Sequence, residues 1–178
     1  PEHEERGPER WLGSPVGTPP SPNPALKQAM IKRALREWEH FNRQVVVLKG
    51  VEESIPHVGA WEDDDTHASR VNLYWRAVGK PRLDGMDCRQ AWSAAFLSWV
   101  MRNAGVPSTQ FRPADAHWVY LSAMVQDAVY PGRYFVPRRI SEYSPEPGDL
   151  ICASRGHSHL SWGEGPISTA ALEGMSAH

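Results

Sequence analysis

The first helical pattern along the chain begins at Ala25. Its apolar positions follow one another at intervals of four, four, four and three residues, which places them on one face of a helix: Leu26, Met30, Ala34, Trp38 and Phe41. The opposite face is charged and carries Lys27, Arg33, Arg36 and Glu37. Because Asn23 can cap a helix and Pro24 suits the first helical position, we expect the helix to start here.

Three further segments show the same period. One carries Ala68, Val71, Trp75 and Val78 on one side and is expected to end at Gly79. Another extends from about Gln90 to Asn103, with Gly105 placed to end it. The last begins near Pro113 and continues to Pro131-Gly132, with one apolar stripe formed by Trp118, Leu121, Val125 and Val129.

Sequence typical of strands is short and occurs mostly after the helices. Val45–Leu48 is β-branched and apolar, whereas residues 50–65 have the composition of an irregular segment. Two more strands are expected at Tyr134–Val136 and at Asp149–Ala153, the second after a turn-forming Pro-Glu-Pro-Gly. This order predicts an α+β fold in which N-terminal helices are followed by a small antiparallel sheet.

The composition fits one domain and a tail. Residues 1–24 are crowded with proline, glycine and charge, so we expect a disordered arm or linker there and a single domain over residues 25–178. The chain starts at Pro1 and not at methionine, from which we expect that a preceding segment was removed. No stretch is apolar over the roughly 20 residues that a membrane span requires.

The charged residues favour neither nucleic acid nor a metal. The net charge is −2, and no basic run alternates with aromatic residues, so a nucleic-acid partner is not expected. The acidic run Glu62–Asp65 is expected to be a solvated loop whose last members cap the following helix. His157 and His159 lack cysteine or carboxylate neighbours at ligand spacing, which favours a surface loop over zinc. We therefore expect no metal and no cofactor.

One helix has the arrangement of a nucleophile helix. The stretch W-S-A-A-F-L-S-W-V-M-R-N-A-G, from Trp92, resembles that of the CHAP and NlpC-type papain-like amidases and peptidases. In those families a cysteine opens the helix, an aromatic residue follows three positions later, and a glycine ends it. Counted from Ser93, these positions are Phe96 and Gly105, whereas counting from Cys88 places neither in register. The resemblance therefore assigns the nucleophile position to Ser93.

The resemblance extends to the rest of the chain. Those families continue with a Pro-Gly-Asp-hydrophobic strand, which Pro147–Ile151 matches, and then with a histidine base, for which His178 is the best placed candidate. More narrowly, W-S-A-A-F, A-H-W-V-Y at 116–120, and P-G-D-L-I-C with Arg155 resemble the bacterial domain-of-unknown-function family 2272, in which serine is usual at this position. Within A-H-W-V-Y, His117 either orients the substrate or the base, or is a half-buried histidine bonded to a carbonyl.

The resemblance implies hydrolysis of an amide bond in a cell-wall peptide or similar molecule, with Ser93 as nucleophile and a periplasmic or secreted location. A serine hydroxyl is too basic for a helix dipole alone to ionise, so it needs a base in hydrogen-bond contact. The alternative is a catalytically inactive papain-like module that binds a peptide, glycan or protein. A third is a toxin domain released by proteolysis.

Two further alternatives stay open at this point. Cys88 is either a substitute nucleophile or a structural thiol of the preceding loop, buried or paired with Cys152. Papain-like domains also have strands and an orienting residue after the base, but this sequence ends at His178. Either the sequence is a fragment, or a partner segment completes the sheet, or the base lies elsewhere.

Overall fold

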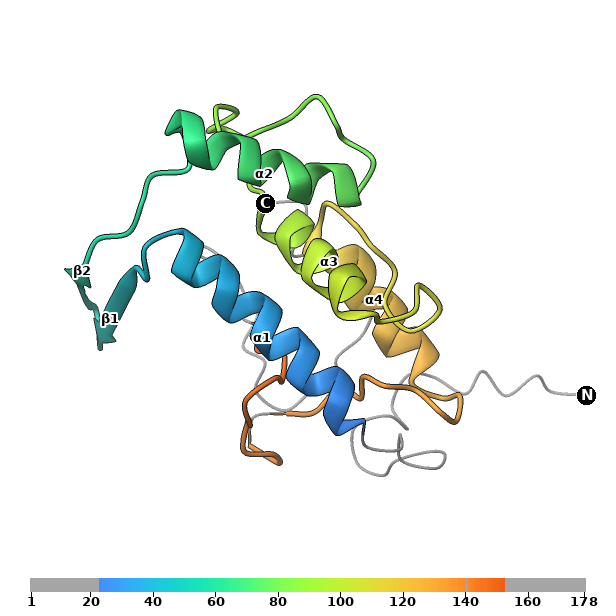
Figure 1. Cartoon of the computed structure of the whole chain (residues 1–178). Helices are drawn as coiled ribbons and strands as arrows, with labels where there is room; N and C mark the ends of the chain where they lie inside the picture. The colour runs from blue at the N-terminus through green and yellow to red at the C-terminus, as the bar shows by residue number, and fades with distance from the viewer. Residues whose placement is uncertain (1–22, 140, 153–178) are drawn as a thin grey trace, which may run out of the picture. The chain divides into compact units, whose positions relative to one another are not determined.

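The computed structural model describes residues 23–139 and 141–152 (Figure 1). Within these ranges the elements follow the order α1 (Pro24–His40), β1 (Val45–Lys49), β2 (Glu52–His57), α2 (Asp65–Ala77), α3 (Ser93–Ala104) and α4 (His117–Asp127). The chain is therefore a mixed α+β protein with helices and a small antiparallel sheet. The expected arm at residues 1–24 and the segment from Ala153 onward lie, apart from residues 23 and 24, outside the described residues.

The described sheet differs from the predicted one in its place along the chain. It lies between α1 and α2 and not after the helices. Residues 134–136 and 149–152 have no strand structure, so the strands expected there are wrong over the described residues. Conversely, β2 occupies part of the segment 50–65, which was expected to be irregular throughout.

Two compact units divide the described residues. The first, here called the helical unit, comprises Pro24–Ser108 and Pro113–Asp115 and contains α1, the sheet, α2 and α3. The second, here called the α4 unit, contains Thr109–Arg112 and the described residues from Ala116 onward.

The core of the helical unit forms between α2 and α3. Val71, Tyr74 and Trp75 of α2 pack with Ala95, Trp99 and Val100 of α3, and all six are at least nine-tenths buried. The helical periodicity predicted for these two segments is therefore confirmed. Asp64 accepts a hydrogen bond from the Thr66 N–H (2.9 Å) and so caps α2, as the acidic run predicted. Gly105 ends α3 at φ +92°, a conformation that favours glycine.

Helix α1 buries a charge where the pattern predicted a solvent-exposed one. Glu37 is only 2% exposed, whereas Trp38, expected on the apolar face, is 42% exposed and donates its indole N–H to the Gln44 carbonyl (2.8 Å). The Glu37 carboxylate accepts hydrogen bonds from Arg70 Nε (2.7 Å) and from the Tyr74 hydroxyl (2.5 Å), and a second from Arg70 Nη2. This buried network joins α1 to α2.

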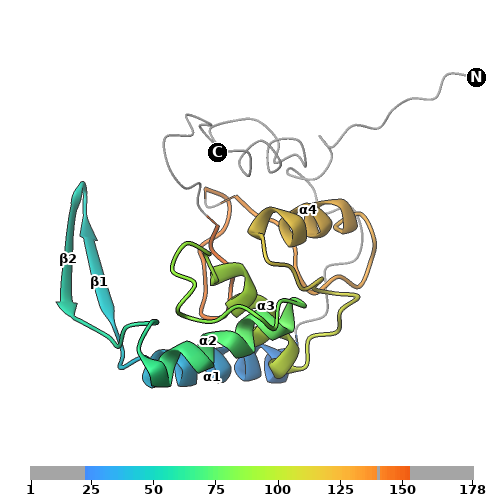
Figure 2. The same cartoon turned by 90° about the horizontal axis from the view of Figure 1, so that it is seen from above.

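Strands β1 and β2 form a hairpin at the end of the helical unit, beyond α1 and α2 (Figure 2). Val47 pairs with Ser54, Lys49 pairs with Glu52, and the turn between them has Gly50 at φ +63°. Every residue of β2 is exposed, and in β1 only Val47 is half-buried. The hairpin therefore adds little to the core.

The α4 unit is organised around Phe111 and the loop that follows α4. The Phe111 ring packs against Tyr120 (centroids 4.7 Å apart) and Phe135 (6.1 Å). Gln110 holds residues 132–134, because its amide donates to the Gly132 carbonyl (3.1 Å) and accepts from the Tyr134 N–H (3.0 Å). This pairing takes up the Tyr134 N–H at the start of Tyr134–Val136, which is a loop and not a strand. None of the described helices is long and apolar enough to cross a membrane.

Candidate functional site

Ser93 is the first residue of α3 and is exposed. The N-cap residue, Trp92, makes no side-chain hydrogen bond to this helix, and the first intrahelical hydrogen bond runs from the Phe96 N–H to the Trp92 carbonyl (2.8 Å). The next residues, Ala94 and Ala95, are small and buried, which fixes the helix against the core. The predicted nucleophile thus stands at the positive end of a helix dipole, on a rigid element.

The residues around Trp92 hold the start of α3 in place. The Trp92 indole N–H donates to Glu62 Oε2 (2.7 Å), and its ring lies near Phe41 (6.0 Å between centroids) and Tyr74 (5.6 Å). Gly85, in the loop before α3, approaches the 62–68 segment so closely that a Cβ atom would lie 1.9 Å from the Glu62 carbonyl oxygen. The loop carrying Glu62 and the start of α3 are therefore fixed together.

Cys88 lies in the same loop as a free, exposed thiol. Its Sγ contacts the Met86 carbonyl at 3.5 Å. Cys152 is also free and exposed, so the interpretation of Cys88 as a buried or disulfide-paired thiol is wrong. Among the described residues, the hydrogen-bond acceptors of Cys88 are backbone carbonyls of its own loop.

A histidine that the sequence analysis did not single out also lies in the helical unit. The His67 ring stands 5.2 Å from Phe41, and its Nδ1 is 3.3 Å from Asp64 Oδ1. A hydrogen-bonded Asp–His pair is typical of catalytic triads, and the signal in the sequence was Asp64 followed three positions later by His67. However, His67 Nε2 faces the His40 carbonyl oxygen at 3.2 Å. Both ring nitrogens thus face oxygens, so His67 is poorly suited to accept a proton from a substrate.

The pKa values of Asp64 and His40 are shifted by groups in direct contact with them or close by. Hydrogen bonding from the Thr66 backbone N–H, and then from His67, lowers the pKa of Asp64. Burial, together with the positive charge of Arg70 and His67, lowers the pKa of His40. These effects stabilise the ionised form of Asp64 and the neutral form of His40.

The other predicted site residues lie elsewhere. His117 is the first residue of α4 and belongs to the α4 unit, where its Nδ1 is hydrogen-bonded to the Tyr120 hydroxyl. The alternative of a carbonyl-bonded histidine stays a prediction. His178 lies outside the described residues. The pairing of Ser93 with a base therefore stays a prediction.

The Tyr120 contact links the tautomer of His117 to the direction of the hydrogen bond at Nδ1. Burial raises the pKa of Tyr120 above its usual value, so its hydroxyl stays protonated. If His117 Nδ1–H donates to this oxygen, Nε2 keeps its lone pair and can accept a proton. If the tyrosine donates, Nε2 carries the hydrogen and can only donate. Both tautomers can orient a substrate, and only the first can act as a base.

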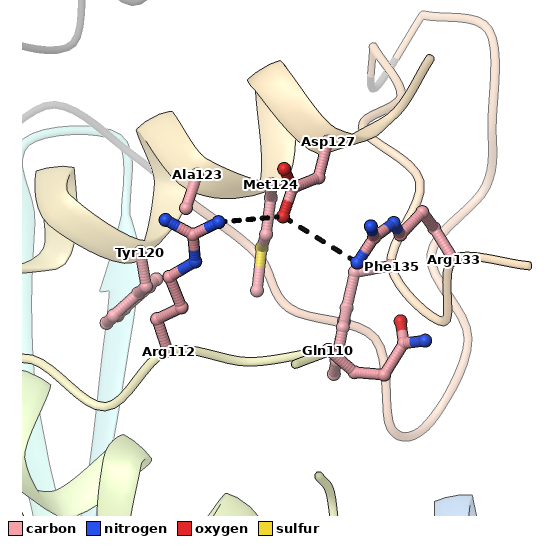
Figure 3. A pocket seen from close by; sticks show the side chains of 8 residues that line it. All are labelled: Gln110, Arg112, Tyr120, Ala123, Met124, Asp127, Arg133 and Phe135. Carbon is pink, nitrogen blue, oxygen red and sulfur yellow. Dashed lines mark ion pairs between the residues drawn. The ribbon is translucent and has the colours of Figure 1, made fainter. Parts of the chain in front are cut away.

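A small pocket in the α4 unit was also missed by the sequence analysis (Figure 3). Arg112, before α4, and Arg133, after it, both face Asp127 at the end of α4, at 3.5 and 3.7 Å. Apolar walls are supplied by Ala123, Met124 and Phe135. The three charged residues come from separate segments, so no local motif in the sequence indicated the pocket. Over the described residues, no group of three or more His, Cys, Asp or Glu side chains could hold a metal ion.

One known protein family matches the part of the chain that contains most of these features. The family described as an uncharacterized protein conserved in bacteria (DUF2272) matches residues 57–172, a range that contains Ser93, His117 and the pocket but not His178. No curated protein and no solved structure matches the chain. Because the matched range is more than half of the 178 residues, the chain belongs to the bacterial family DUF2272.

Proposed function

We propose that this chain is a papain-like hydrolase of amide bonds in which Ser93 replaces the usual cysteine nucleophile. The observation that carries the proposal is the position of Ser93, exposed at the first residue of α3 and so at the positive end of the helix dipole. The first-turn N–H groups of a helix have no intrahelical acceptor, so they are suited to stabilise an oxyanion formed beside Ser93. The order of the motifs described above supports the papain-like assignment.

The reaction requires a base that takes the Ser93 proton during attack on the carbonyl carbon. His178 is proposed for this role, and His117 is proposed to orient the substrate or the base. A cell-wall peptide or a similar amide is the proposed substrate. The protonated histidine would then give its proton to the departing amine as the amide C–N bond breaks, which leaves an acyl-enzyme on Ser93. Water, activated by the same histidine, would hydrolyse that acyl-enzyme.

The test is labelling of the full chain with a fluorophosphonate, followed by peptide mapping. We expect the label on Ser93, and no label in Ser93→Ala or in His178→Ala. Ser69→Ala is the matched control, because Ser69 is an exposed helix serine of the same unit whose hydroxyl donates to the Thr66 carbonyl (3.1 Å). An unlabelled Ser93 in the folded chain, with amide hydrolysis unchanged in Ser93→Ala, would refute the proposal.

A second function, binding without catalysis, is favoured by Trp61. This side chain is 73% exposed and adjoins Glu62, which is hydrogen-bonded to the residue before Ser93. An exposed tryptophan beside a fixed surface is suited to stack on a glycan or peptide. If the chain is a binding module, Trp61→Ala abolishes ligand binding and Ser93→Ala does not. A turnover that His178→Ala abolishes would exclude this alternative.

A further inference from the structure

The pocket of the α4 unit contains more positive than negative charge. Two guanidinium groups face one carboxylate, which leaves one net positive charge. The distances from Asp127 Oδ2 to Arg112 Nη2 and Arg133 Nη1, 3.5 and 3.7 Å, exceed those of hydrogen-bonded ion pairs, about 2.7–2.9 Å. Each guanidinium is therefore left with hydrogen-bonding capacity that Asp127 does not use.

The Arg133 side chain is held in position, but in the described part of the chain not all of its hydrogen-bond donors have an acceptor. Its Nη1 donates to the Thr109 carbonyl (2.9 Å), and its guanidinium lies over the Tyr130 ring (5.6 Å to the centroid). The bonds of Gln110 to residues 132 and 134 fix the backbone on both sides of it. Its Nε atom is nevertheless buried without a hydrogen-bond partner among the described residues. A buried donor without an acceptor is costly, and no described residue offsets this cost at Arg133 Nε.

We propose that this pocket binds the carboxylate of a small organic acid or of a peptide end. The net charge of +1 matches a carboxylate monoanion, and the two planar guanidiniums match its two oxygens. Met124 and Phe135 provide apolar surface for the group that carries the carboxylate. Figure 3 shows both guanidiniums and the Met124 and Phe135 side chains around the pocket.

The competing explanation is structural. Asp127 is the last residue of α4, where a negative charge is unfavourable, and the two arginines could serve only to compensate it. This explanation predicts no carboxylate binding. It also predicts that Asp127→Asn leaves the affinity for anions unchanged.

The test is a titration of the full chain with N-acetyl-L-alanine, followed by amide chemical shifts in 109–135. N-acetyl-L-alanine amide serves as the neutral control, and inorganic phosphate tests for general anion binding. We expect shifts with the carboxylate, none with the amide, and weaker binding of phosphate. No shifts with the carboxylate, equal shifts with the amide, or preferential binding of phosphate would each overturn the proposal.

Variants distinguish the site from general charge effects. Arg112→Gln should weaken carboxylate binding about tenfold, because a charge-assisted hydrogen bond is lost. The Arg112 side chain is 62% exposed, so this change is not expected to affect folding. Asp127→Asn should strengthen binding several-fold, since it removes the competing carboxylate. Arg138→Gln, which removes an exposed arginine outside the pocket, should have no effect.

The proposal does not depend on Ser93. The pocket uses none of the residues assigned to hydrolysis, so Ser93→Ala should bind N-acetyl-L-alanine as the wild type does. Unchanged binding in Arg112→Gln, or equal weakening in Arg138→Gln, would show that the pocket is not the binding site.

Discussion

Each of the two units contains a carboxylate that faces arginine, but the two arrangements differ in burial and in geometry. In the helical unit, the Glu37 side chain is 3% exposed and accepts hydrogen bonds from Arg70 Nε at 2.7 Å and Tyr74 at 2.5 Å. In the α4 unit, the Asp127 side chain is 21% exposed, and its two arginines stand at 3.5 and 3.7 Å. The Glu37 carboxylate is fully engaged in short hydrogen bonds to its partners. Over the described residues, the Asp127 carboxylate makes only long ion pairs, so its two arginines keep donors that could bind another group.

The pKa of Glu37 reflects the quality of its network. Burial by itself raises the pKa of this carboxyl, but hydrogen bonds from Arg70 and Tyr74 and the charge of Arg70 outweigh burial and lower it. The carboxylate is thus more stable in the folded chain than in water. A buried charge of this kind contributes to stability only while all its partners are present. The comparison therefore assigns a structural role to Glu37 and a binding role to the Asp127 pocket.

The largest expected effect follows from Glu37→Gln. Removing this charge leaves Arg70 partly buried without its counter-ion, so the free energy of unfolding should fall by about 3 kcal/mol. Urea denaturation followed by tryptophan fluorescence measures the change. Glu39→Gln is the control on the same helix, because Glu39 pairs with Arg43 at an exposed position (2.9 Å) and should change stability by less than about 0.5 kcal/mol.

Acid should remove the same contribution. Because the pKa of Glu37 is lower in the folded chain than its ordinary value of 4.5, its stabilising effect is full above that value and is lost as the pH falls through the folded pKa. The difference in unfolding free energy between wild type and Glu37→Gln should therefore shrink below pH 4.5. A difference that is constant over pH 3–7 would contradict the assignment.

A smaller effect is expected from Tyr74→Phe. The change removes one hydrogen bond to the Glu37 carboxylate but keeps the ring and its packing against Trp99 (5.2 Å between centroids). The free energy of unfolding should fall by about 1.5 kcal/mol. Tyr130→Phe, at an exposed tyrosine, is the matched control. If Tyr74→Phe has no effect in thermal unfolding, the hydroxyl is not part of the network.

The smallest effect on stability is expected from Asp127→Asn. Its ion pairs are long and partly exposed, so the free energy of unfolding should change by less than about 1 kcal/mol. Denaturation under the conditions used for Glu37→Gln measures this directly. A loss similar to that of Glu37→Gln would remove the distinction between the two carboxylates and would make Asp127 a structural residue.

Periodicity and caps predicted the helices because both signals are local. Asp64 before α2 and Gly105 after α3 stand where the sequence placed them. The face of α1 was assigned correctly at Met30 and Phe41 but wrongly at Glu37 and Trp38, because helical spacing does not reveal that Glu37 has partners 33 and 37 residues away. Those partners make burial of a charge acceptable, and no pattern within the helix indicates them.

The strands were harder to predict for a related reason. β2 contains two glutamates and a proline and has no apolar alternation, since the hairpin is exposed. Tyr134–Val136 has strand-like composition but is held as a loop by Gln110, which lies 24 residues before Tyr134. For the candidate site, the resemblance placed Ser93 at a helix start, where α3 begins, whereas periodicity alone started this helix at about Gln90. The sequence did not indicate the pocket around Asp127, because its members come from three segments.

The exposed hairpin also offers a position where extra residues can be inserted into the chain. Val51, at the tip beside Gly50, is fully exposed, and an isolated two-stranded hairpin contributes little stability of its own. The entropic cost of closing a loop grows only slowly with its length, so a peptide inserted at this turn would leave the packing of the helices unchanged. The tip of the hairpin is therefore the natural point for attaching an affinity tag or a spectroscopic reporter.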